Sequence, residues 1–256
     1  MILTDSHCHL AMVENADATL EAARRAGVGG FIVPSTMLED VEPVVALSSR
    51  NHDVWGAVGF HPHEARDFDE AAEKVVREAA LGERIVAIGE IGLDYHYMHS
   101  PRETQKDVLR RQLSIAKELR LPVIIHNRES SEDLLSILSS EEARGTRGVL
   151  HSFTEGWEVA RALVEKELFI SFSGIITFKT AETLRDVARR LPRESVLIET
   201  DSPFLAPVPH RGKPNEPALV IEIAKLLGSL WGVSVEEVAR VTTSNFERAF
   251  GVKIPE

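Results

Sequence analysis

The sequence contains a single cysteine, Cys8, so no intrachain disulfide can form, and sparse cysteine is typical of proteins in a reducing compartment. It also lacks any apolar run approaching the roughly 20 residues that a membrane-spanning helix needs. Met1 is followed directly by an apolar segment rather than by the basic region and apolar core of a signal peptide. We therefore expect a cytoplasmic protein that does not associate with a membrane.

Positive charge is scarce as well. Lys and Arg number 29 against 40 Asp and Glu, which gives a formal net charge of −11 at pH 7. A protein that holds nucleic acid through its phosphates normally has a basic footprint, and this chain has none overall. The balance argues against extended, non-specific duplex binding. Any polyanionic substrate would have to be attracted by bound metal and a few basic residues at one face.

The chain has no low-complexity tract and no break in composition that would mark a linker. Its 256 residues, 43% of them hydrophobic, are ample for one large core. We expect a single domain over residues 1–256, with no obligate protein partner.

Two histidines, His7 and His9, follow the first apolar segment and are separated by one residue. On a strand, side chains at i and i+2 share a face, about 6.7 Å apart at the backbone. One metal ion can therefore take a nitrogen from each imidazole. A bare His-x-His motif is equally compatible with two unrelated histidines, so the interpretation depends on the rest of the chain.

Eight apolar segments rich in Val and Ile alternate with segments of helical periodicity. The expected strands are residues 2–3, 30–35, 54–60, 85–90, 121–125, 147–150, 168–172 and 196–198. The expected helices are residues 15–26, 38–51, 68–81, 102–119, one that starts at about 130, 155–167, 181–191, 218–230 and 235–250. Continuous apolar strands indicate a parallel sheet covered on both faces. The pattern predicts an α/β protein, either a closed (β/α)8 TIM barrel or an open doubly wound sheet.

Residues that bind metals stand at the ends of several of these strands. The set comprises four histidines and two carboxylates: His7, His9, Glu90, His126, His151 and Asp201. They converge on one mouth only if the sheet closes, which favours the barrel. Any one of them alone is more often a hydrogen-bonded core histidine or a helix cap. All six together are enough for two divalent ions.

The two carboxylates have distinct expected roles. Glu90 can bridge two ions because it has one oxygen for each, and Asp201 can both ligate a metal and accept a proton from the attacking water. Two ions roughly 3.5 to 4 Å apart can activate that water and stabilise the attacking and leaving oxygens of a displacement. We expect one or two divalent metal ions as cofactors. The ligand types leave magnesium, manganese, zinc and similar metals open.

Six motifs carry these residues and their neighbours. They are Asp5-Ser6-His7-Cys8-His9, Gly59-Phe60-His61-Pro62-His63, Gly89-Glu90-Ile91-Gly92-Leu93-Asp94-Tyr95, Ile125-His126-Asn127-Arg128, His151-Ser152-Phe153 and Glu199-Thr200-Asp201-Ser202-Pro203. The set resembles the TatD family of metal-dependent deoxyribonucleases, within the amidohydrolase superfamily, over nearly the whole chain. The resemblance implies a TIM barrel, a one- or two-metal site on the six residues named above, and hydrolysis of DNA phosphodiester bonds, often from a 3′ end.

The sequence departs from that family at one motif. The usual His-Cys-Phe-Ser/Thr-Gly is replaced by residues 151–156, in which Ser152 stands for cysteine and Glu155 precedes the glycine. Glu155 adds negative charge near the expected mouth, which opposes strong polynucleotide binding. Many relatives in the wider superfamily bridge their metals with a modified lysine on the fourth strand. Glu90 at that place favours the TatD branch.

Three residues outside the ligand set are candidates for contact with a scissile phosphate: His61, His63 and Arg128. We expect His61 to take part in catalysis as well as in binding. His63 could instead cap the segment that follows it. Arg128 can meet two phosphate oxygens at once, unless it is engaged in a salt bridge to Glu129 or Glu132.

Three further residues have weaker assignments. Lys179 and Arg211 follow the seventh and eighth strands, where barrels commonly bind phosphate, although solvated surface charge is about as plausible. Glu199 shares a face with Asp201 and is expected to hold a ligand histidine from outside.

The sequence supports three functions. The first is a deoxyribonuclease of 3′-to-5′ exonuclease type, which acts on DNA ends or short single strands. The second is a hydrolase of small amides, esters or phosphoesters, which the acidic charge and Glu155 favour. The third is a metal-binding barrel without catalysis, which a complete ligand set disfavours.

Overall fold

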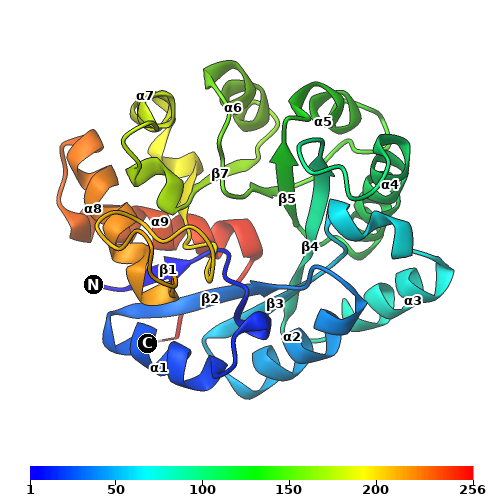
Figure 1. The fold of residues 1–256 in the computed structure, drawn as a ribbon, viewed down its shortest axis with the longest axis horizontal. Coiled ribbons are helices and arrows are strands. Elements are labelled where there is room, and N and C mark those ends of the chain that lie inside the picture. Colours follow the sequence, from blue (N-terminus) through cyan, green and yellow to red (C-terminus); the bar gives the residue numbers. More distant parts are fainter. Residues whose placement is uncertain (256) are drawn as a thin grey trace.

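The computed structural model describes residues 1–255, and their eight strands form one parallel sheet in the order β1 to β8. The strands are β1 (Leu3–Asp5), β2 (Val28–Pro34), β3 (Val54–Val58), β4 (Ile85–Asp94), β5 (Val123–Arg128), β6 (Gly148–Leu150), β7 (Phe169–Phe172) and β8 (Val196–Ile198). Every strand pairs with the next in the chain. Figure 1 shows them around a common centre, with the helices outside.

The segments that follow β1 and β8 close the sheet into a barrel. The amide of Ser6 donates to Ile198 O at 3.1 Å, and the amide of Asp201 donates to His7 O at 3.0 Å. Cys8 and Ser202 form a parallel bridge one step further along. The predicted (β/α)8 barrel is therefore confirmed, and the open doubly wound alternative is wrong.

Helices follow the strands as the periodicity predicted. They are α1 (Ala16–Arg25), α2 (Leu38–Arg50), α3 (Glu70–Ala79), α4 (Arg102–Leu119), α5 (Ser131–Leu138), α6 (Trp157–Val164), α7 (Glu182–Arg190), α8 (Val220–Trp231) and α9 (Val235–Phe250). Five short 3-10 segments lie between them: η1 (Leu10–Met12), η2 (Pro62–Asp67), η3 (Gly174–Thr177), η4 (Arg193–Ser195) and η5 (Pro217–Leu219). The predicted ends differ by a few residues at most, because hydrophobic periodicity locates a helix better than its termini.

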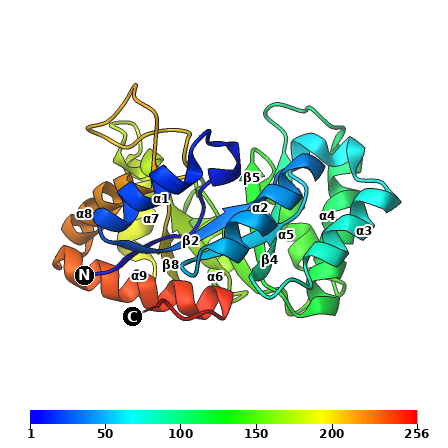
Figure 2. The ribbon, with the colours of Figure 1, turned by 90° about the horizontal axis from the view of Figure 1, so that it is seen from below.

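The barrel interior is filled from below by α9. Phe246, Ala249 and Phe250 of this helix pack against inward-facing strand residues such as Ile32, Ala87 and Ile124, all of them buried. Figure 2 shows α9, in red, across one end of the barrel, and the loop after β8, in gold, at the opposite end. The end that α9 covers is closed by apolar packing. The carboxyl ends of the strands are left for polar side chains.

One strand is longer than expected. β4 runs to Asp94, so Glu90 lies inside the strand and not at its end as predicted. Its register against β5 shifts between Ile88 and Ile91, which marks an irregularity around Glu90. The prediction, which ended this strand at Glu90, therefore stopped four residues too early. A side chain at Gly92 would collide with the backbone of His126, so the glycine permits the close pairing of β4 with β5.

No single helix in residues 1–255 has the length and apolar composition to cross a membrane. Only the pair Pro217–Trp231 and Val235–Phe250 passes when taken together, and it is bent by 108°.

Candidate metal centre

His7 and His9 follow β1 and are held by bonds to both neighbouring strands. Between them, the amide of Cys8 donates to Ile32 O on β2, and the amide of His9 donates to Ser202 O after β8. The two imidazoles meet edge to face, with Nε2 atoms 3.1 Å apart. Both rings are buried. The short spacing on an extended backbone thus brings the two nitrogens together, as the sequence predicted.

The Glu90 carboxylate lies between two sets of donor atoms. Its Oε2 is 3.3 Å from His7 Nε2 and 3.6 Å from His9 Nε2. Its Oε1 is 3.1 Å from His126 Nδ1 and 2.8 Å from His151 Nε2. The structure therefore brings all six predicted residues to one place, with one Glu90 oxygen facing each side.

We call the set on the Oε2 side the first donor group: His7, His9, Asp201 and Glu90 Oε2. Asp201 Oδ1 is 3.4 Å from His9 Nε2 and 3.9 Å from His7 Nε2. Ligands about 2.1 Å from one ion, at tetrahedral or octahedral angles, lie about 3.0 to 3.4 Å from each other. Three of the five donor distances, 3.1, 3.3 and 3.4 Å, fall in this range, and the other two, 3.6 and 3.9 Å, are longer, so small side-chain movements would bring the set around a single divalent ion. The nitrogen and carboxylate atoms suit such an ion.

We call the set on the Oε1 side the second donor group: His126, His151 and Glu90 Oε1. His126 Nδ1 and His151 Nε2 are 3.4 Å apart, again within the range for one ion. The remaining nitrogen of each ring meets a carboxylate. His126 Nε2 is 3.1 Å from Asp94 Oδ2, and His151 Nδ1 is 3.2 Å from Glu199 Oε1. These bonds fix which nitrogen of each ring faces Glu90.

Glu199 occupies the place that the sequence suggested for it, behind His151. It is fully buried and also accepts a hydrogen bond from the amide of Ser152 at 2.7 Å. Ser6 Oγ donates to its other oxygen. The carboxylate is thus held on both sides and orients the imidazole.

Asp94 is the residue that sequence reasoning missed. Besides His126, its Oδ2 lies 3.1 Å from His63 Nε2, and its Oδ1 accepts the amides of His96 and Tyr97. The signal was present, because Glu90 and Asp94 are four positions apart, and residues an even number of positions apart on one strand share a face.

Asp5 supports the first donor group from beneath. Its carboxylate accepts bonds from the backbone amide and the hydroxyl of Thr200, and from the amide of His7 at 3.3 Å. Burial raises the pKa of Asp5 to about 8, although the Thr200 bonds oppose the shift. This residue ties the start of the chain to the segment that carries Asp201.

The mutual charges of the centre set its protonation. Burial opposes ionisation of Glu90, but its electrostatic interactions with His151, His61 and His7 outweigh burial and hold the Glu90 pKa well below its usual range. Burial also disfavours the charged form of His151. Glu90 and Glu199 overcome that penalty and raise the His151 pKa well above 6.5. Glu90 is therefore ionised at neutral pH, as a metal-binding carboxylate must be.

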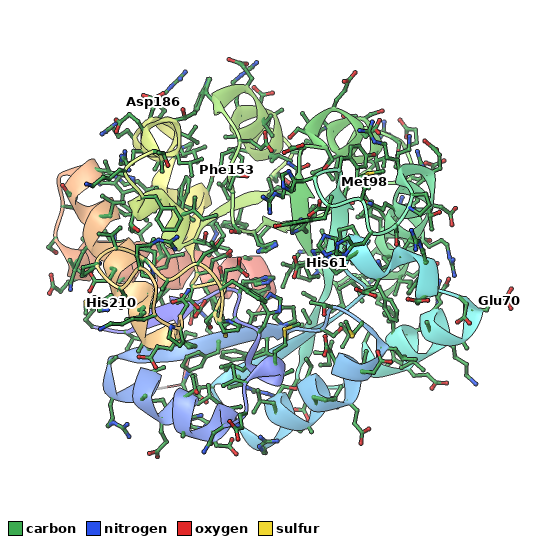
Figure 3. The ribbon with its side chains drawn as sticks, viewed as in Figure 1. His61, Glu70, Met98, Phe153, Asp186 and His210 are labelled. Atoms are coloured by element: carbon green, nitrogen blue, oxygen red, sulfur yellow. The ribbon has the colours of Figure 1, made fainter. Side chains whose placement is uncertain are left out.

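His61, labelled in Figure 3, follows β3, and its Nε2 lies 3.4 Å from Glu90 Oε1. Its Nδ1 accepts the amide of His63 at 3.1 Å and so caps η2. The capping role considered for His63 thus belongs to His61. Burial lowers the His61 pKa well below 6.5, and a neutral ring that accepts at Nδ1 carries its proton on Nε2. His61 is thereby suited to donate a hydrogen bond and not to ligate a metal.

Arg128 is exposed at the end of β5, and neither of the salt bridges considered as an alternative for it, to Glu129 or to Glu132, forms. Glu129 pairs with His96 instead, and in residues 1–255 no carboxylate oxygen lies within 4.0 Å of the guanidinium. The group stacks over the Tyr97 ring, 4.8 Å from its centroid. It is a free cation beside the second donor group.

The remaining candidates lie further out. Arg211 stacks over Phe178 and donates to Ala206 O, while Lys179 is exposed at the end of η3. Glu155 is partly buried and accepts a hydrogen bond from Asn127 Nδ2 at 3.0 Å. This hydrogen bond ties the unusual acidic residue to Asn127 near the carboxyl end of β5.

The comparisons with known proteins agree with this arrangement. The model of a family described as TatD related DNase matches residues 4–251. The uncharacterized metal-dependent hydrolase YcfH of Escherichia coli K12 is 41% identical, over 98% of this chain and 97% of that one. The corresponding hydrolase YabD of Bacillus subtilis 168 is 37% identical, over 98% of this chain and all of that one.

A solved structure extends the similarity to three dimensions. The crystal structure of YJJV, a TatD homologue from Escherichia coli K12, is similar with a TM-score of 0.93 at 32% identity, covering 98% of both chains. The chain therefore belongs to the TatD related DNase family.

Proposed function

We propose that this metal-dependent hydrolase cleaves phosphodiester bonds at the ends of short single-stranded DNA. The observation that carries the proposal is the division of the donor atoms into two groups that share the Glu90 carboxylate. Displacement at a phosphate needs charge stabilisation at both the attacking and the leaving oxygen, and two adjacent cation sites meet that need.

The first donor group would hold one divalent ion and the second donor group another. When bound, such ions supply Lewis-acid activation of a water and neutralise charge on the phosphate. The chain itself must bind the substrate, orient it and handle the protons.

Asp201 is the residue to which we assign the proton of the attacking water. Burial opposes its ionisation. The hydrogen bond from His9 and the charges of nearby histidines outweigh burial and lower the Asp201 pKa, so the carboxylate is ready to accept. Its side chain is 13% exposed, more than that of His7 or Glu90, which leaves it accessible from the mouth.

His61 and Arg128 are the residues we assign to the phosphate. The Nε2 proton of His61 points toward the centre and can be donated to a non-bridging oxygen. Arg128 can add a bidentate contact because no carboxylate competes for it in the part of the chain that the structure describes. His63, held by Asp94, would support the ring of His61, with which it is in edge contact.

The preference for ends and short strands follows from charge and shape. A body of net charge −11 repels an extended polyanion, whereas a few cations at the mouth attract one or two phosphates. An intact duplex would have to bend to bring an internal phosphodiester to Glu90, and bending has a substantial free-energy cost.

The test is a time course on end-labelled single strands, matched duplexes and a sealed circle, with magnesium or manganese present and Asp201→Asn as the blank. We expect the single strands to be shortened from one end. The end whose label is released first gives the polarity of the reaction. Rapid cutting of the sealed circle would rule out action at ends.

A small phosphoester, ester or amide is the second candidate substrate. Glu155, anchored 3.0 Å from Asn127, adds negative charge near the mouth that a long polyanion would have to overcome. Turnover of a small ester or amide in the same panel, with no cutting of any DNA, would establish this alternative.

A further inference from the structure

The loop after β8 exposes apolar side chains that neither the fold nor the metal centre requires to be exposed. Phe204, Leu205 and Val208 are 49%, 43% and 42% exposed, respectively. We call these three residues the apolar rim. A single exposed apolar residue is ordinary, but several on one loop beside a polar centre indicate a surface that binds something.

Phe204 is the member of the apolar rim next to the metal centre. Its ring lies 5.6 Å from that of His9, centroid to centroid, at 70° between planes. It also follows Asp201 by three residues. The Phe204 ring is therefore adjacent to the first donor group.

The backbone that carries Phe204 is firmly bonded. The amide of Phe204 donates to Asp201 O at 3.0 Å, and Asn215 Nδ2 donates to Phe204 O at 2.6 Å. Further along, the amide of Val208 donates to Thr177 Oγ1. The exposed ring is thus presented from an ordered loop, which lowers the entropy that a ligand must remove on binding.

Two basic residues, Arg211 and Lys213, belong to this loop, and Lys179 closely follows Thr177, whose hydroxyl accepts the amide of Val208. Arg211, Lys179 and Lys213 are exposed, and within residues 1–255 none has a carboxylate oxygen within 4.0 Å. Figure 2 places the loop on the same side of the barrel as the carboxyl ends of the strands. In Figure 3, His210 marks this loop on one side of His61, while Met98 marks the loop after β4 on the other.

We propose that Phe204 is a stacking site for the nucleobase next to the scissile phosphate. An exposed aromatic ring on a loop that also carries cations without a carboxylate partner among residues 1–255 is the combination that single-stranded nucleic acid requires, because every base has a π-face and every linkage a negative charge. The inference rests on the proposed function and specifies how its substrate is held. It places the stacked base next to the first donor group and not next to the second.

The experiment is a double-mutant cycle between the ring and the base. One set of single-stranded oligonucleotides has every base, and two further sets have an abasic residue at the terminal or the penultimate position. Each is hydrolysed by the wild-type protein and by Phe204→Ala. We expect Phe204→Ala to lower kcat/KM about tenfold on the complete strand, mainly through KM.

The decisive comparison is the abasic substrate. If Phe204 stacks on the missing base, one of the two abasic positions will lower the wild-type rate by a similar factor, and Phe204→Ala will add no further loss on that strand. Phe204→Trp should restore the rate on the complete strand to within about twofold, since tryptophan also stacks.

Two controls separate stacking from structural damage. Leu81, 73% exposed, lies between α3 and β4, away from the mouth, and Leu81→Ala should leave every rate unchanged. Equal losses from Phe204→Ala on complete and abasic strands, or no loss at all, would overturn the stacking site while the proposed function stood. A wild-type protein inactive on every strand would overturn the proposed function, and this inference with it.

Discussion

The first and second donor groups share Glu90 but are supported differently. In the first group, His7 and His9 have buried Nδ1 atoms without a hydrogen-bond partner. In the second, the outer nitrogens of His126 and His151 meet the carboxylates of Asp94 and Glu199. One group has its additional carboxylate, Asp201, among the donors, and the other has its carboxylates behind the rings.

This difference predicts two sites of unequal strength. The first group offers four donor atoms, including one whole carboxylate, and its His7 side chain is fully buried. The second offers three, and its His126 side chain is 19% exposed. A site with fewer protein ligands keeps a position open for water or substrate. We therefore expect the first group to bind its ion more tightly and the second to exchange its ion and meet the substrate.

The largest effect is expected when the shared residue is changed. Glu90→Gln keeps the shape but removes the charge that both groups use, so activity should fall by about three orders of magnitude or more and neither ion should bind well. Metal titration, activity and circular dichroism check this outcome. Glu129→Gln, at an exposed carboxylate paired with His96, is the matched control and should be nearly silent. A variant that kept full metal and the wild-type rate would contradict the shared role of Glu90.

Asp94→Asn should separate the two groups. The amide leaves His126 without its carboxylate partner, and loss of such a partner typically weakens metal binding about 10- to 100-fold. We expect that loss for the weaker ion only, with the tighter ion unchanged in a calorimetric titration. Asp133→Asn is the control, because Asp133 accepts a hydrogen bond from Tyr95 and contacts no residue of either donor group. It should change the affinity for neither ion. Equal weakening of both ions would show that the groups are not independent.

The pH dependence of metal binding should sharpen the same contrast. Burial disfavours the charged forms of His126 and His151, but their carboxylate partners outweigh it and raise both pKa values above 6.5. In the first group the His9 pKa is raised, whereas burial lowers that of His7. An ion must displace any proton held on a ligand nitrogen, so binding weakens as pH falls.

The second group should therefore release more protons per ion than the first. Between about pH 8 and pH 6, the affinity for the weaker ion should fall more steeply, by up to about tenfold per pH unit for each proton displaced. Titrations at several pH values, with proton release followed in weak buffer, measure both slopes. Equal slopes for the two ions would contradict the expected difference in protonation between the groups.

The smallest effect is expected at the edge of the second group. Arg128→Ala removes a cation that no carboxylate neutralises, so KM for a short oligonucleotide should rise several-fold while kcat changes little. Arg161→Ala, at an exposed residue already paired with Glu158, controls for net charge. Identical KM values in the two variants would argue that Arg128 does not touch the phosphate.

The sequence predicted the candidate metal ligands better than the residues that hydrogen-bond to them. Barrel closure brings residues that follow parallel strands to one end, so His7 and Asp201 could be grouped without coordinates. Glu90 was grouped with them although it lies inside β4. The outer bonds depend on side-chain rotamers and on register, as in the shift that places Asp94 behind His126. Among residues 1–255, Arg128 is unpaired because Glu129 pairs with His96 instead. Local sequence does not determine which of the two side chains forms the ion pair with Glu129.

The closure of the barrel between β1 and β8 also makes the centre dependent on the completed chain. Asp5 and Thr200, which are 195 positions apart, bond to each other directly beneath the first donor group. Contacts of such long sequence separation form late and slowly in folding. A nascent chain that ends before Asp201 has His7 and His9 but no complete first donor group. We expect a chain truncated before Asp201 to be inactive, because it lacks part of the first donor group and the Asp5–Thr200 bonds that support it.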